Sequence, residues 1–183
     1  CIGRIAPEKG QREFVAAAAL IHHALPECRF AIYGAPLFSD AAAARYQTEV
    51  RAAAAGLPVE WAGWIPDVYV AIAQLDLLLV PSAGHEATPR VIFEAFAAGV
   101  PVIAFASGGI PEAVEHGVTG LLAHSAEEMA QLAILLLSRD PRRLISIARA
   151  ARASWQRSFT LEHYHEQLLR AVEASAISDR SNR

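Results

Sequence analysis

Residues 76–105 decide the fold class, and they read DLLLVPSAGHEATPRVIFEAFAAGVPVIAF. The stretch begins and ends with a short apolar run, at 76–80 and 101–105, and each run is closed by Pro, Gly or Ser. Between the runs, residues 89–98 have the apolar spacing of a helix. A connection of this length joins parallel strands through a crossover helix, whereas a hairpin needs only a short turn.

The same alternation of short apolar runs and helical patterns continues along the rest of the chain. Further strands are expected at 29–33, 59–62 and 120–122, and a short helix after residue 109. Runs that are apolar at nearly every position are typical of parallel strands buried on both faces. The sequence therefore predicts an α/β protein, a Rossmann-like doubly wound parallel sheet with flanking helices. The other helices are expected near residues 11–24, 40–55, 67–74, 126–138, 141–156 and 161–176.

Composition limits the possible functions. The 183 residues are 54% hydrophobic and 19% charged, which favours a packed domain over a disordered chain. A formal net charge of −3 argues against a protein that binds nucleic acid through its phosphates. The sequence predicts neither a membrane span nor an export signal. Because the chain opens Cys1-Ile2-Gly3-Arg4 and its one methionine is Met129, we expect an excised piece of a longer protein.

The cysteines and histidines do not predict a metal site. Cys1 and Cys28 lack CxxC spacing, so we expect two free thiols and a reducing compartment, the cytoplasm. The histidine pairs 22/23 and 163/165 point to different faces of their helices, so no metal is expected. His85 and His116 are interpreted as surface histidines, although His85 could also donate to a phosphate or a sugar.

In a doubly wound sheet the ligand lies beyond the carboxyl ends of the strands, so the loops there are the candidate site. The first loop, residues 3–10, reads GRIAPEKG and contains Arg4 and Lys9, two cations that could clamp a diphosphate. The alternative is two solvated cations on a surface turn.

The second loop, residues 81–90, enters the helix expected at 89–98. Thr88 is predicted to cap this helix and Pro89 to be its first residue. The free amides from Arg90 and Val91 onward would then form an anion site. An ordinary capped helix without a ligand is the alternative.

The same segment contains two glutamates with seven residues between them. Glu86 would stand at the reacting end of a bound ligand, and Glu94 could accept hydrogen bonds from vicinal hydroxyls such as those of a ribose. Glu94 could instead be a helix-surface charge, but it lies among apolar neighbours, where a carboxylate needs a partner.

Two further loops complete the candidate site. The loop at 106–112 contains Gly108 and Gly109, which would let backbone amides approach phosphates, although a tight connection without a ligand would also use glycines. The loop at 63–67 contains Trp64 and Ile65. We expect the Trp64 ring to fill the core rather than to form the wall of a base site, while the backbone of both residues lies near a nucleobase.

In their order, these motifs resemble the C-terminal domain of group 1 (family 4) glycosyltransferases, over nearly the whole chain. The hallmark of that family is a pair of glutamates separated by seven residues, matched here by Glu86 and Glu94. The resemblance implies the C-terminal half of a GT-B fold that binds a nucleoside-diphosphate sugar without a cofactor or metal, in an enzyme that retains anomeric configuration. It implies these site residues: Glu86 as the catalytic group at the donor sugar, Glu94 for the ribose, and Arg4, Lys9, Thr88, Pro89, Arg90 and Val91 for the diphosphate.

The resemblance also implies the domain organisation. Residues 1–183 would be one nucleotide-sugar-binding domain, with a crossover helix at about 157–176 that packs onto an N-terminal acceptor domain absent from this chain. Such a piece would bind donor but transfer sugar poorly. One departure is Glu86-Ala87-Thr88-Pro89, where many members have a glycine-rich stretch.

Other functions stay open at this stage. A sugar-nucleotide epimerase half and a non-catalytic nucleotide-binding module would use the same architecture. A nicotinamide or flavin oxidoreductase is disfavoured because no GxGxxG follows a strand. The sequence specifies neither the base, the sugar nor the acceptor, which could be a glycan or a lipid at a membrane surface.

Overall fold

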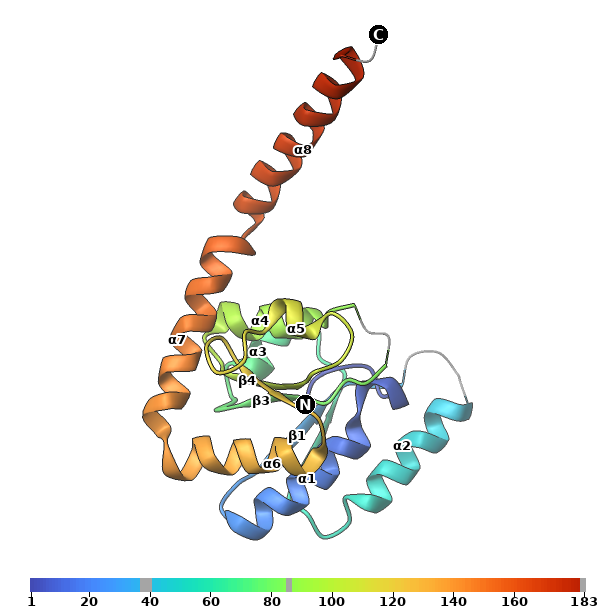
Figure 1. Ribbon diagram of the computed structural model, residues 1–183. Coiled ribbons are helices and arrows are strands. Elements are labelled where there is room, and N and C mark those ends of the chain that lie inside the picture. Colours follow the sequence, from blue (N-terminus) through green and yellow to red (C-terminus); the bar gives the residue numbers. More distant parts are fainter. Residues whose placement is uncertain (37–40, 85–86, 182–183) are drawn as a thin grey trace.

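The computed structural model describes residues 1–36, 41–84 and 87–181, and its strands are paired in parallel (Figure 1). One sheet pairs β1 (Phe30–Tyr33) with β2 (Val59–Gly63). The other has the order β3 (Leu78–Val80), β4 (Val102–Phe105), β5 (Leu121–Ala123). Residues 1–3 extend the first sheet beside β1, where the Tyr33 N–H donates to the Cys1 carbonyl at 2.9 Å.

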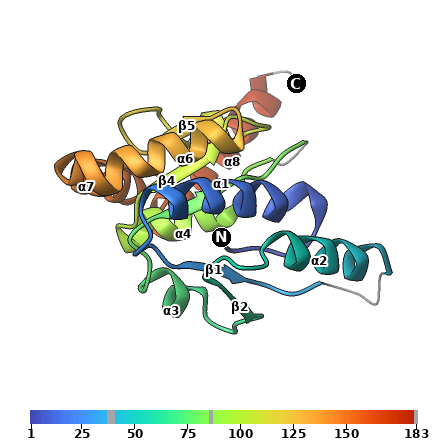
Figure 2. The same cartoon turned by 90° about the horizontal axis from the view of Figure 1, so that it is seen from below.

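Helices cover both faces of the strands. One face carries α1 (Gln11–Ala24), α2 (Ala41–Ala53) and α6 (Ala126–Ile134), and the other carries α3 (Val68–Ile72), α4 (Arg90–Ala98) and α5 (Ile110–Ala113). Figure 1 shows α4 and α5 above the strands and α1 and α6 below them. In β4, Ile103 packs in the core on the α1 side and its neighbour Ala104 in the core on the α4 side. This alternation confirms the predicted Rossmann-like α/β fold. The prediction that the strands are buried on both faces is wrong for β2, whose residues are partly buried or exposed, because it pairs with β1 on one side only, at the edge of its sheet (Figure 2).

The C-terminal elements differ in part from the prediction. The helix expected at 126–138 ends as α6 at Ile134 and continues as a π-helical turn, η2 (Leu135–Arg139). The next helix, α7 (Pro141–Ser158), buries Ala151 in the same core cluster as Phe96 of α4. A second helix, α8 (Leu161–Ser181), follows it, because the Thr160 hydroxyl accepts from the His163 N–H at 3.2 Å and starts a new helix. Figure 1 shows α8 pointing away from the body of the molecule.

Two further sequence features can be compared with the structure. Both cysteines are free thiols, as predicted, with Cys1 buried and Cys28 partly buried. None of the helices in the described part of the chain combines the length and the hydropathy needed to cross a membrane.

Candidate functional site

The loops beyond the carboxyl ends of the strands are joined to one another by hydrogen bonds. The Ala83 N–H donates to the Glu8 carbonyl at 3.0 Å, which links the first and second predicted loops. The Ser107 hydroxyl donates to the Ser82 carbonyl at 2.6 Å, which links the second loop to the third. After β1, the Gly34 N–H donates to the Gly63 carbonyl at 2.7 Å. The fold therefore brings the predicted loops to one edge of the molecule.

Two glycines allow this close approach. Gly10 has a φ of 70°, and a Cβ added there would lie 1.9 Å from the Pro81 carbonyl oxygen. A Cβ on Gly109 would lie 2.0 Å from the Ala87 carbonyl oxygen. Any side chain at either position would push two loops apart. Gly109 therefore touches the backbone of the neighbouring loop, and its predicted partner Gly108 precedes it in the same turn.

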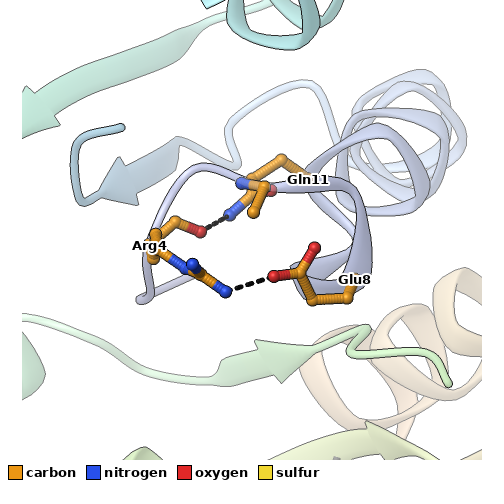
Figure 3. Close-up of polar contacts among 4 residues, drawn as sticks. Arg4, Glu8 and Gln11 are labelled. Atoms are coloured by element: carbon orange, nitrogen blue, oxygen red, sulfur yellow. Dashed lines mark hydrogen bonds and ion pairs between the residues drawn. The ribbon is translucent and has the colours of Figure 1, made fainter. Parts of the chain in front are cut away.

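A buried glutamine fixes the backbone of the first loop (Figure 3). Gln11 is fully buried, and its amide nitrogen donates to the Arg4 carbonyl at 2.8 Å. Its side-chain oxygen accepts from the Ala6 N–H at 3.3 Å. Both ends of the amide are thus used to hold the loop in shape. Sequence reasoning missed Gln11, because a glutamine at the start of an amphipathic helix has the pattern of a surface residue.

Above this fixed backbone, the Arg4 guanidinium forms an ion pair with Glu8, as Figure 3 shows. The two side chains are 40% and 47% exposed, so the pair lies at the surface of the loop. The other predicted cation lies close by, because Lys9 Cδ is 3.8 Å from the place where a Cβ would stand on Gly3. The structure therefore places both cations on one turn, which ends in a 3-10 segment, η1 (Pro7–Lys9).

Trp64 lines a pocket of about 200 Å³ together with Arg4, Ile65 and Val68. The residue is 67% exposed, so the prediction that its ring fills the core is wrong. The reason is local: β2 ends at Gly63 with a φ of 73°, and the Asp67 side chain then caps α3 by accepting from the Tyr69 N–H at 2.9 Å. The segment between these two residues runs along the surface. Arg4 and Trp64 therefore border the same pocket.

The start of α4 differs from the prediction. Pro89 is the N-cap, with φ −63° and ψ 124°, and the helix begins at Arg90. Thr88 does not cap it, because the Thr88 hydroxyl lies 2.7 Å from the Ala87 carbonyl oxygen and 3.2 Å from that of Gly109 and donates toward them. The hydroxyl joins two loops instead of satisfying a helix amide. The amides of Arg90 and Val91 still precede the first hydrogen bonds of the helix.

Glu94 lies one turn further along α4 and has a charged partner there. Its side chain is 19% exposed, and its Oε1 is 3.6 Å from Nη2 of Arg90, which is 92% exposed. Glu94 also lines a cavity of about 710 Å³ with Tyr69 and Trp155. Because Val68 borders the Trp64 pocket and Tyr69 borders this cavity, the two hollows flank the start of α3.

Two of the predicted residues fall outside the part of the chain that the structure describes. His85 and the predicted catalytic residue Glu86 are outside the described residues. Within residues 1–36, 41–84 and 87–181, no three His, Cys, Asp or Glu side chains gather closely enough to hold a metal ion.

Comparison with known proteins places this chain in a family. It matches the family Glycosyl transferases group 1 over residues 1–139. The chain belongs to the group 1 glycosyl transferases. This finding confirms the resemblance drawn from the order of the motifs.

Two bacterial members illustrate the relationship. This group 1 glycosyl transferase is 36% identical over 166 residues to D-inositol 3-phosphate glycosyltransferase of Mycolicibacterium smegmatis, covering 84% of this chain and 36% of that protein. It is 35% identical over 109 residues to amylovoran biosynthesis glycosyltransferase AmsK of Erwinia amylovora, covering 56% of this chain and 27% of that protein. The chain spans less than half of the length of the curated relatives it matches.

Solved structures show which part of the fold is present. HepE of Anabaena, crystallised with UDP-glucose, superposes with a TM-score of 0.84 at 27% identity, over 94% of this chain and 47% of HepE. The C-terminal domain of LpcC, a group 1 family protein of Francisella tularensis, superposes with a TM-score of 0.74 at 23% identity, over 87% of this chain and 85% of that domain. The fold of this glycosyl transferase chain is therefore that of a C-terminal domain in its family.

Proposed function

We propose that this domain is the donor-binding half of a retaining glycosyltransferase, which transfers a sugar from a nucleoside-diphosphate sugar to an acceptor. The observation that carries the proposal is the pocket in which Arg4 and Trp64 meet at the carboxyl edge of the strands. A guanidinium suits a diphosphate, and an exposed indole suits the face of a nucleobase. Superposition over 94% of the chain on HepE, which was crystallised with UDP-glucose, adds to it.

In this proposal different residues bind different parts of the donor. Arg4 and Lys9 bind the diphosphate, together with Thr88, Pro89 and the free amides of Arg90 and Val91, while Gly108 and Gly109 keep the neighbouring loop close. Trp64 and Ile65 contact the nucleobase. Glu94 binds the ribose hydroxyls, and its Oε1 lies 3.6 Å from Nη2 of Arg90 at the start of the same helix. Glu86 contacts the donor sugar near the reacting carbon.

The proposed chemistry depends on charge at the leaving group. As the bond to the sugar breaks, negative charge grows on the nucleoside diphosphate, and two cations and the amides of α4 stabilise it without a divalent metal or cofactor. The departing phosphate accepts the proton of the acceptor hydroxyl on the same face of the sugar, which retains the anomeric configuration. The acceptor is held by residues outside this chain. The proposed compartment is the cytoplasm, because free thiols are typical of reducing surroundings.

Calorimetric titration with UDP, GDP and ADP, with and without magnesium, tests the donor site. We expect one diphosphate to bind independently of metal, and Arg4→Ala to weaken it at least several-fold, because a charge-assisted contact is lost. Arg12→Ala is the matched control, since Arg12 also forms an exposed ion pair, with Glu49 at 2.6 Å. Absence of binding in the folded chain, or equal affinity of Arg4→Ala and the wild type, would contradict the proposal.

The reaction itself requires the full-length protein. We expect a glycosylated acceptor whose anomeric configuration, read by NMR, equals that of the donor sugar. An epimerised sugar nucleotide formed without acceptor would instead identify the epimerase alternative. Binding without any turnover would identify a non-catalytic module.

A further inference from the structure

We infer that Glu8 sets the affinity of the donor site by acting as an internal counter-anion for Arg4, which a bound diphosphate displaces. This inference rests on the proposed function, because it assigns Arg4 to the diphosphate. It assigns a residue that weakens diphosphate binding, whereas the residues named under the proposed function strengthen it.

The contact itself places Glu8 in competition with the ligand. Glu8 Oε1 and Arg4 Nη2 form an ion pair across one turn of the loop, and both side chains are about half exposed. Arg4 is also the cation that borders the Trp64 pocket. The carboxylate of Glu8 therefore occupies one nitrogen of the Arg4 guanidinium, as Figure 3 shows, and a diphosphate bound to Arg4 would compete for it.

The backbone on both sides of this pair is fixed, so that only the side chains can rearrange. Gln11 holds the Arg4 carbonyl, and the Glu8 carbonyl accepts from the Ala83 N–H at 3.0 Å. In the same loop, the Lys9 N–H donates to the Ala6 carbonyl at 2.9 Å and closes the 3-10 turn. Glu8 therefore cannot retreat by a backbone movement without breaking these bonds.

Charge decides the direction of the effect. A diphosphate carries more negative charge and more acceptor oxygens than one carboxylate, so it displaces Glu8 from the Arg4 guanidinium. The cost is the lost Arg4–Glu8 pair and the repulsion between Glu8 and the phosphates. Exposed ion pairs are weak, so the cost is small and the site still binds. Removing the charge of Glu8 should therefore tighten diphosphate binding.

The test is titration of wild-type chain and Glu8→Gln with UDP, GDP and ADP. For the diphosphate that binds, we expect Glu8→Gln to tighten binding about two- to five-fold, which is the size of effect that an exposed ion pair supports. The gain should shrink as salt is raised, because salt screens the repulsion. The matched control is Glu49→Gln, which removes the partner of Arg12 and should leave the affinity unchanged.

A double variant separates this role from a structural one. In an Arg4→Ala background, Glu8→Gln should lose most of its gain, because the guanidinium for which it competes is gone. Unchanged or weaker binding in Glu8→Gln would overturn the inference, and weaker binding would show that Glu8 orients Arg4 for the ligand. If neither chain binds any of the three diphosphates, the proposed function fails and the inference fails with it, an outcome distinct from binding without a gain.

Discussion

Gly10 is the residue on which the contact between the first two loops depends. An alanine there would need a positive φ, which costs roughly 1–2 kcal/mol, and its Cβ would overlap the Pro81 carbonyl, which costs about 1–3 kcal/mol more. We therefore predict that Gly10→Ala lowers the free energy of unfolding by about 2–5 kcal/mol, measured by urea denaturation.

Gly56 offers a matched control for this prediction. It has a φ of 83° but nothing within 4 Å of an added Cβ, so Gly56→Ala should show the backbone cost alone. Equal losses in the two variants would mean that the overlap with Pro81 is relieved by a small shift and does not hold the loops.

Single residues also show where sequence reasoning succeeds and where it fails. Arg4 and Lys9 are predicted on one loop, and the structure places both on one turn, while their role toward a diphosphate stays a prediction. Gln11 could not be selected from the sequence, because its role depends on its burial and a polar side chain gives no sign that it is buried. The Trp64 ring is predicted to fill the core, but a turn at Gly63 and a cap at Asp67 keep it at the surface. The environment of Glu86 stays a prediction.

At the scale of elements, periodicity predicted most helices and strands, and hydrogen bonds determined their ends. The range 11–24 coincides with α1, which starts after Gly10 in a left-handed conformation. The strand predicted at 76–80 begins only at Leu78, whose N–H donates to the Pro101 carbonyl at 3.0 Å. The π-helical turn after α6 has no signature in apolar spacing, so the sequence predicted one continuous helix there.

The two last helices should contribute very differently to stability. In residues 161–170 of α8 the large apolar side chains are exposed, with Leu161 at 65% and Leu169 at 63%, whereas α7 buries Ile147 and Ala151. We predict that a chain ending at Thr160 melts within a few degrees of the full chain. A chain ending at Arg139 should melt far lower, because each large buried side chain contributes roughly 1.5–3 kcal/mol.

Differential scanning calorimetry of the three chains makes this comparison. A large drop on removal of α8 alone would show that α8 packs on the body in solution. Its predicted role as a crossover onto an acceptor domain would then need revision, because a helix already packed on this domain offers no free face.

At the scale of the whole molecule, the two sheets meet near the amino end of the chain. Cys1 lines a cavity of about 460 Å³ together with Phe30 of β1 and Leu79 of β3. Its amine donates to the Ala31 carbonyl at 2.8 Å. In the 183-residue polypeptide, a buried amine therefore lies beside residues of both sheets.

In the polypeptide that starts at Cys1, burial lowers the pKa of the amine from 8.0 to about 5. Between these values the unfolded chain binds more protons than the folded chain, so the free energy of unfolding rises from pH 5 to pH 8 and is lost as pH falls. A pKa shift of one unit corresponds to 1.36 kcal/mol, so we predict that the free energy of unfolding, measured by urea denaturation, changes by up to about 4 kcal/mol across this pH range. Other groups titrate in the same pH range, so the control is the N-acetylated chain, whose amide carries no charge. The difference between the two chains isolates the amine, and identical pH profiles would mean that this group is solvated in the folded protein.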